Sequence, residues 1–162
     1  MKYRRLTLDE LNDMETEFVR FLVSNTITAE DWKKIKSDNP ERAEGLIEIF
    51  SDIVFDKVLE KVKYIEHRSP YDIKTFRCLE DKIELLGLKV SSVAGIDFTQ
   101  NQTPENMLAY LKYAPAGSVH MYSAEKAYKD NNPKKEIFNM LESGGAISDG
   151  KIFEALLTLK KK

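Results

Sequence analysis

The stretch that decides the fold is Asn39–Ser69, NPERAEGLIEIFSDIVFDKVLEKVKYIEHRS, the longest uninterrupted patterned run in the chain. Asn39-Pro40 predicts a helix start, because asparagine caps a helix N-terminus and proline is tolerated at the first helical position. Apolar residues then recur at helical spacing to about residue 62. From Tyr64 the pattern alternates, which is typical of a strand. We therefore predict a long central helix over about residues 40–62 that leads into a sheet.

The apolar face of this helix changes direction along its length. Its first half directs one apolar set to one side, and its second half directs another set more than a third of a turn away. The two sets are Ala43, Leu46, Ile47, Phe50, Ile53 and Val54, then Phe55, Val58, Leu59 and Val62. We interpret the helix as a strut that is covered by helices near its start and by the sheet near its end. The alternative is a kink near Phe55.

Upstream of the strut, the sequence predicts two helices. Thr7 and Glu10 have capping-box spacing, and apolar residues follow in one stripe, so a helix is expected from about Leu8 to Val23. Thr28 and Asp31 repeat the capping signal before a short second helix with Trp32.

Downstream of the strut, strands come first and helices follow. Residues 64–68, 72–78 and 82–90 read as an antiparallel meander, with a bulge expected beside Gly87, where alternation slips. Helices are predicted after Pro104, after Pro133 and around Ile152. A further strand is predicted at Val119–Tyr122, and a loop is predicted over Ser143–Ser148.

These elements predict an α+β fold, with a small antiparallel sheet packed with about five or six helices around the long central helix. The chain has 162 residues, 42% of them hydrophobic and 32% charged, which suits one folded domain over residues 1–162.

Composition excludes several classes of function. A net charge of −2 provides no global attraction to nucleic acid or anionic lipid, so nucleic acid is an unlikely partner and no membrane partner is expected. No window approaches the roughly 18 apolar residues of a membrane span. Cys78 is the sole cysteine, which prevents an intramolecular disulfide and fits a cytoplasmic location. Its expected role is that of a small buried side chain.

The weak catalytic candidates are Glu66, His67, Arg68 and His120. Glu66-His-Arg-Ser69 places a carboxylate, an imidazole, a guanidinium and a hydroxyl at a strand end, a mixture that suits acid–base chemistry or anion binding. However, alternation along the strand separates Glu66 and Arg68 from His67. Structural roles are therefore favoured over catalysis.

Two other patterns suggest ligands only at first sight. Gly145–Lys151, GAISDGK, follows the first seven positions of a phosphate-binding loop, but residue 152 is Ile and a helix precedes the loop, so no nucleotide is expected. Acidic residues recur every fourth position on the central helix and suit a solvated face, a basic partner or, at Asp52 and Asp56, a divalent ion. We expect no cofactor and no metal. The acidic positions are Glu44, Glu48, Asp52, Asp56 and Glu60.

Three segments carry a resemblance to a known family: ITAEDWKKIK, FSDIVFDKVLEKVKYIEHRSP and KIELLGL. Together they resemble an uncharacterised family of short bacterial proteins, a domain of unknown function. The resemblance covers most of the chain and is strongest up to about Val90. It implies a stand-alone bacterial protein and brings no activity or ligand to any residue.

The leading functional hypothesis is a non-catalytic cytosolic binding or regulatory module. Its partner would be a second copy, forming a homodimer, or another protein, because the change of apolar face on the central helix leaves apolar surface exposed. The alternative is a small hydrolase or nucleic-acid-processing enzyme that uses Glu66–Ser69 with His120.

Overall fold

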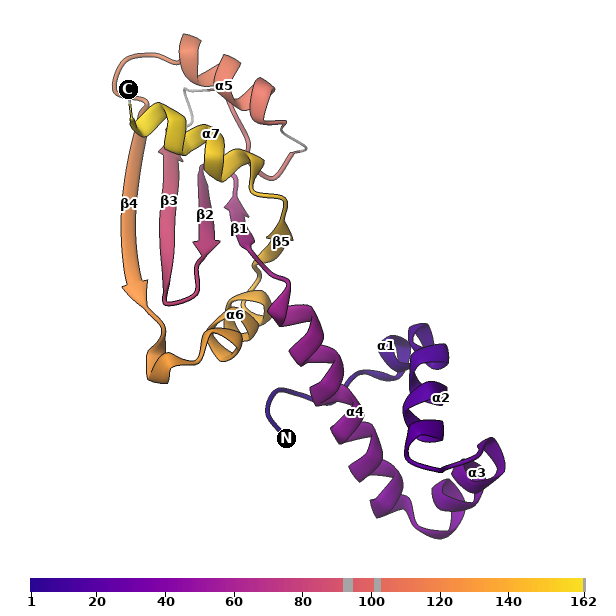
Figure 1. Ribbon diagram of the computed structural model, residues 1–162. Helices are drawn as coiled ribbons and strands as arrows, with labels where there is room; N and C mark the ends of the chain where they lie inside the picture. Colours follow the sequence, from indigo (N-terminus) through magenta and orange to yellow (C-terminus); the bar gives the residue numbers. More distant parts are fainter. Residues whose placement is uncertain (92–94, 101–102, 162) are drawn as a thin grey trace. The chain divides into compact units, whose positions relative to one another are not determined.

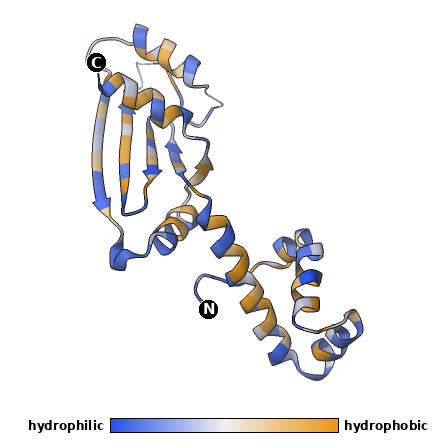
Figure 2. Ribbon diagram, in the orientation of Figure 1, coloured by the Kyte–Doolittle hydropathy of each residue, from blue (hydrophilic) through white to orange (hydrophobic). Residues whose placement is uncertain are grey.

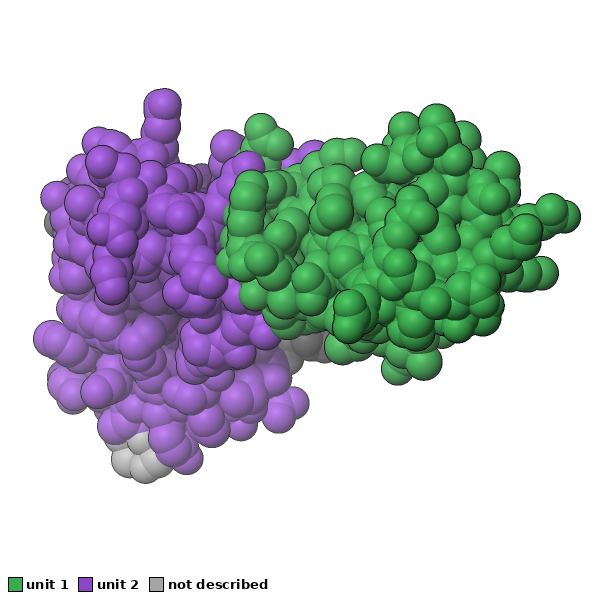
Figure 3. All heavy atoms as spheres, turned by 90° about the horizontal axis from the view of Figure 1, so that it is seen from below, with its two compact units in different colours: residues 1–60 green, residues 61–162 purple. Residues whose placement is uncertain are grey.

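The computed structural model describes residues 1–91, 95–100 and 103–161. The chain divides into two compact units, Met1–Glu60 and Lys61–Lys162, which Figure 3 colours separately. The fold is α+β: the described residues form seven α-helices and a five-stranded antiparallel sheet. No helix in this part of the chain is long and apolar enough to cross a membrane.

The first unit is helical, with α1 (Leu8–Asp13), α2 (Glu15–Ser24), α3 (Ala29–Asp38) and α4 (Pro40–Glu60). Both predicted capping boxes form, at Thr7 and at Thr28. The single helix predicted over Leu8–Val23 is wrong in one respect, because Met14 leaves helical geometry at φ −110° and ψ 26° and so separates α1 from α2. The amide of Phe18 still donates to the Met14 carbonyl at 2.9 Å, so the chain resumes its helix at once.

Helix α4 is the long helix that the sequence predicts, and it runs without a break through Phe55. The alternative of a kink there is therefore wrong. Its second apolar face begins at Phe55, whose ring lies 5.8 Å from the ring of Tyr3 and 4.9 Å from the guanidinium carbon of Arg4. Within the first unit, the N-terminal segment thus packs on Phe55, while the first turns of α4 contribute to the unit's core. That core comprises Leu6, Phe18, Leu22, Ile27, Ile35, Ala43, Ile47 and Phe50.

The second unit is built on a sheet with the strand order β4-β3-β2-β1-β5 (Figure 1). The predicted meander is confirmed as β1 (Tyr64–Ser69), β2 (Asp72–Cys78) and β3 (Lys82–Val90), and the further strand is β4 (Val119–Ala127). The predicted bulge beside Gly87 is wrong, because β3 keeps continuous register with both neighbours. Gly87 has a different use: a Cβ there would lie 2.1 Å from the ring of Tyr122.

Helix α7 (Lys151–Lys160) covers one side of the sheet, which we call the first face, and α5 (Pro104–Tyr113) packs on α7 (Figure 1). The core of the unit lies between these helices and the sheet. Hydrophobic residues are frequent along α7 and β3 (Figure 2). The buried members of the core are Ile73, Leu86, Leu88, Val90, Ile96, Phe98, Met107, Ile152, Phe153 and Leu156.

The opposite side of the sheet, the second face, is partly covered by α6 (Pro133–Glu142), which follows a 3₁₀ turn at Lys129–Asn131. Met140 of α6 lies beside Phe76, Ile83 and Leu85 of this face. The loop predicted at Ser143–Ser148 is wrong in its last three residues, because Ala146–Ser148 form β5 and pair with β1. Three residues are too few for alternation to reveal a strand.

Candidate functional site

The predicted cluster at Glu66–Ser69 is divided between the two faces of the sheet. Glu66 and Arg68 lie on the first face, where two guanidinium nitrogens donate to Glu66 Oε1 at 2.7 and 3.1 Å. Arg68 Nη1 also donates to the carbonyl of Phe98 at 3.3 Å. This pair therefore ties β1 to the segment that carries buried Phe98.

His67 and Ser69 lie on the second face. His67 is exposed, and Ser69 Oγ donates to the Asp72 carbonyl at 3.2 Å across the β1–β2 turn. His120 is on the same face, but β2 and β3 separate the two histidines. Three interstrand spacings make about 14 Å, which exceeds the reach of direct proton transfer. The structure does not bring Glu66, His67, Arg68 and His120 into one pocket.

A different polar network occupies the second face. The Tyr122 hydroxyl donates to Asp72 Oδ1 at 2.5 Å, and Lys74 Nζ lies 2.5 Å from Asp72 Oδ2. Partial burial alone would raise the pKa of Asp72, but the bonds from Lys74 and Tyr122 outweigh it and hold that pKa below its usual value. The ring of Tyr122 spans β3 above Gly87, so this network ties edge strand β4 to β2.

Cys78 is buried, as the sequence predicts, and burial raises the pKa of its thiol to about 11. A thiol with so high a pKa is a poor nucleophile near neutral pH. Among the described residues, no three His, Cys, Asp or Glu side chains lie close enough together to hold a metal ion.

The acidic stripe of α4 receives a partner from within the first unit, the N-terminal segment. Asp52 accepts hydrogen bonds from the amides of Lys2 and Tyr3 at 2.9 and 3.2 Å. Asp56 accepts from the Tyr3 hydroxyl at 2.7 Å and pairs with Lys2 Nζ at 3.2 Å. Partial burial and the Asp56 bond both raise the pKa of Tyr3. Sequence reasoning allowed for a basic partner but did not identify it in the same chain.

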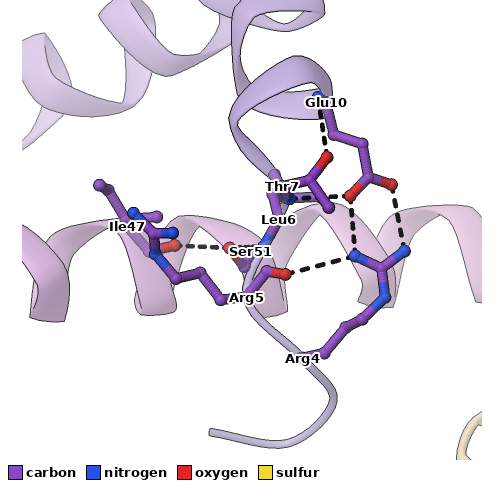
Figure 4. A network of polar contacts seen from close by, with 7 residues as sticks. All are labelled: Arg4, Arg5, Leu6, Thr7, Glu10, Ile47 and Ser51. Atoms are coloured by element: carbon purple, nitrogen blue, oxygen red, sulfur yellow. Dashed lines mark hydrogen bonds and ion pairs between the residues drawn. The ribbon is translucent and has the colours of Figure 1, made fainter.

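A second set of contacts fixes the chain between this segment and α1 (Figure 4). Buried Ser51 accepts from the amide of Leu6 at 2.9 Å and donates to the carbonyl of Ile47 at 2.7 Å. Arg4 donates twice to Glu10, at 2.7 and 3.1 Å, and Glu10 also closes the capping box with Thr7. The start of α1 is therefore held firmly against α4.

An apolar groove with a volume of about 640 Å³ lies in the first unit, and Arg5 and Leu8, next to that anchor, are among its lining residues. Its floor is made of core side chains, among them Leu11, Phe18, Leu22, Trp32 and Ile47. Three large apolar side chains stand in solvent along it: Leu8 is 70% exposed, Val19 48% and Val23 62%.

Charges around the groove are unevenly distributed. Arg5 and Glu44 both line it and pair with each other at 2.8 Å. Of the other charged lining residues, Lys33 and Lys36 come from α3, whereas Glu15 comes from α2. The α3 wall is therefore basic beside an apolar channel.

Sequence reasoning missed this groove because it followed a single apolar stripe along residues 8–23. The available signal was a second apolar pair four residues apart, Val19 and Val23, adjacent to that stripe. A pair in that position predicts a wider apolar surface than one packed side of a helix requires.

The comparisons with known proteins add a family but no activity. No curated protein matches the chain, and no solved structure matches it either. The resemblance to a family without known activity is confirmed by a match that runs over residues 1–161. The chain belongs to that family, which is described as a family of unknown function, DUF6495.

Proposed function

We propose that the protein is a binding module whose first unit receives an amphipathic helix of a partner protein in the groove between α2, α3 and α4. The observation that carries the proposal is the exposure of Leu8, Val19 and Val23 around a groove whose floor is already apolar. Exposed apolar side chains that are contiguous with a hollow are the usual mark of an interaction surface.

A helix is the occupant that suits this shape best. Helix-in-groove recognition places apolar anchors at spacings of three or four residues into a channel between helices. Here Val19 and Val23 are one helical turn apart on α2, so they present a ridge with the same repeat. Burying a large apolar side chain stabilises a complex by roughly 1.5–3 kcal/mol, which makes these residues candidate anchoring contacts.

The positive charge of the α3 wall indicates which charged residues should flank the apolar stripe of the partner helix. Lys33 and Lys36 are matched by one acid, Glu15, on the other side of the groove. A partner helix with Asp or Glu beside its apolar stripe would pair with these lysines, and a lysine-flanked helix would meet like charge. We therefore assign an acid-flanked amphipathic helix as the ligand class.

The test uses displayed helical peptides with apolar anchors at i, i+3, i+4 and i+7, flanked either by Glu or by Lys. Binders selected on the full chain should be Glu-flanked, and Val23→Asp should weaken them about tenfold or more, because it places a charge in the apolar channel. Ile49→Asp is the matched control, since Ile49 is 54% exposed on α4 but does not line the groove.

Two results would contradict the proposal. One is equal loss of binding in Val23→Asp and Ile49→Asp, which would place the peptide elsewhere. The other is a selection that returns only Lys-flanked peptides or none that bind saturably. Trp32 lies in the groove and is the only tryptophan, so its fluorescence reports both binding and the integrity of the unit.

A further inference from the structure

Strand β4 forms a long edge of the sheet in the second unit. All nine of its residues, Val119–Ala127, are in register with β3 on one side. No described strand pairs with its other side, whereas the opposite edge of the sheet is β5, with three residues (Figure 1). An edge strand of this kind presents a row of backbone donors and acceptors to whatever approaches it.

The β4 edge lacks most of the features that usually prevent such pairing. Proteins protect edges with short strands, prolines, bulges or charged side chains, lysine above all. β4, with the sequence VHMYSAEKA, contains no proline, its register with β3 is unbroken, and its carboxylate and its one lysine, Glu125 and Lys126, both lie near one end.

Several contacts also hold β4 in place as a regular strand. Tyr122 reaches Asp72 on β2, Lys82 of β3 pairs with Glu125 at 3.1 Å, and Lys160 of α7 donates to Ser123 Oγ at 3.2 Å. A strand that is already ordered loses little entropy when another strand joins it.

We propose that the outer edge of β4 pairs antiparallel with β4 of a second copy of the chain, about a two-fold axis at Ser123. This register is the one that pairs all nine residues. It sets His120 opposite Lys126, Met121 opposite Glu125, Tyr122 opposite Ala124 and Val119 opposite Ala127. No two lysines and no two acids face each other, whereas centring the axis on Glu125 or Lys126 would set that residue against itself, which is destabilising.

Self-pairing also closes the assembly. A two-fold interface uses the same surface on both copies and leaves nothing to propagate. The joined sheet would have ten strands, and both of its remaining edges would be the short β5. This interface is separate from the groove of the first unit, so either proposal can fail alone.

Cysteine cross-linking tests the register directly. In Ser123→Cys the two Cα atoms would lie about 4.5–5.5 Å apart, within the range of a disulfide. In Ala127→Cys, the matched control on the same strand, they would lie about 27 Å apart, eight residues along the strand. Oxidation of the full chain should therefore give a covalent dimer from Ser123→Cys and little from Ala127→Cys. Cys78 is buried and remains in both variants.

Two substitutions of opposite charge at His120 give a second test, whose readout is the dissociation constant of the dimer. His120→Glu sets an acid opposite the partner's Lys126 twice per dimer and should tighten the dimer several-fold, and His120→Lys should weaken it by a similar factor. Sedimentation equilibrium measures both. A chain that remains monomeric at its highest soluble concentration would overturn the proposal. Equal cross-linking of the two cysteine variants, or equal dissociation constants for the two His120 variants, would also overturn it.

Discussion

Ser51 joins the N-terminal segment of the first unit to α4. It is completely buried, and its hydroxyl links the amide of Leu6 to the carbonyl of Ile47. A serine inside a helix commonly bonds its own preceding turn. Here the same oxygen also accepts a hydrogen bond from the amide of Leu6 in the N-terminal segment. The Ser51 side chain therefore provides the hydrogen-bond acceptor for this buried amide.

Replacing Ser51 with Ala should lower the free energy of unfolding of the first unit by about 1–3 kcal/mol, because it leaves the buried amide of Leu6 unpaired. Urea unfolding followed by Trp32 fluorescence measures this. Ser37→Ala is the control: its hydroxyl makes a similar bond to the Lys33 carbonyl but is exposed, so the change should be within about 0.5 kcal/mol. Equal effects of the two substitutions would contradict this role for Ser51.

We expect Glu10 to make the first unit sensitive to acid. Hydrogen bonds from Arg4 and from the amide of Thr7 lower the pKa of Glu10 from its ordinary 4.5 to about 2. A carboxyl whose folded-state pKa is depressed stabilises the fold above its unfolded-state pKa and loses that contribution as pH falls toward the folded-state value. Stability should therefore decline between about pH 4.5 and about pH 2.

Glu10→Gln should flatten this decline, since glutamine can keep the capping-box geometry without titrating. The measurement is the urea midpoint by Trp32 fluorescence at a series of pH values. The effect is moderated by solvent, because the Glu10 side chain is 39% exposed. Arg4→Gln should flatten the decline similarly. If stability falls with pH as steeply in both variants as in the unmodified protein, the decline has another origin.

Local chemistry explains which residue contacts the sequence could predict. Thr7 and Glu10 are three residues apart, so their capping box follows from spacing alone. Tyr3 and Asp52 are 49 residues apart, and nothing local indicates that they meet. The sequence therefore revealed the acidic stripe of α4 without revealing that the N-terminal segment occupies it.

Among the secondary-structure elements, the strands could be predicted from the sequence, whereas the irregularity expected within one of them could not. Alternation and turn residues predicted β1, β2 and β3 correctly. The same reasoning predicted a bulge beside Gly87, because the alternation slips between Leu85 and Leu86, just before the glycine. The glycine instead makes room for a side chain from β4, which depends on cross-strand neighbours and not on the sequence of β3.

Gly87→Ala should destabilise the second unit by about 1–3 kcal/mol, because the added methyl group displaces the Tyr122 ring from its bond to Asp72. Cys78 is the only cysteine and is buried in this unit, so its rate of labelling in urea reports unfolding there. In the double variant with Tyr122→Ala, the combined loss should be smaller than the sum of the two single losses. Strict additivity would mean that the two residues do not interact.

At the scale of the whole molecule, each of the two units has its own core. The sequence correctly predicted an α+β fold with a long helix over about residues 40–62, which the structure has as Pro40–Glu60. Its expectation of a single domain stays a prediction. Val19 and Val23 indicate extra apolar surface in the sequence, but the groove itself depends on segments far apart in the chain, because α1, α2, α3 and the start of α4 all line it.

The most direct test of the binding proposal is methyl NMR of the full chain, titrated with a Glu-flanked amphipathic helical peptide. Saturable shifts should concentrate on Leu8, Leu11, Val19 and Val23, which line the groove, with little change at Ile49 or at the methyl groups of the second unit. Saturable shifts centred outside the groove, or none in the groove at saturating peptide, would contradict the binding proposal.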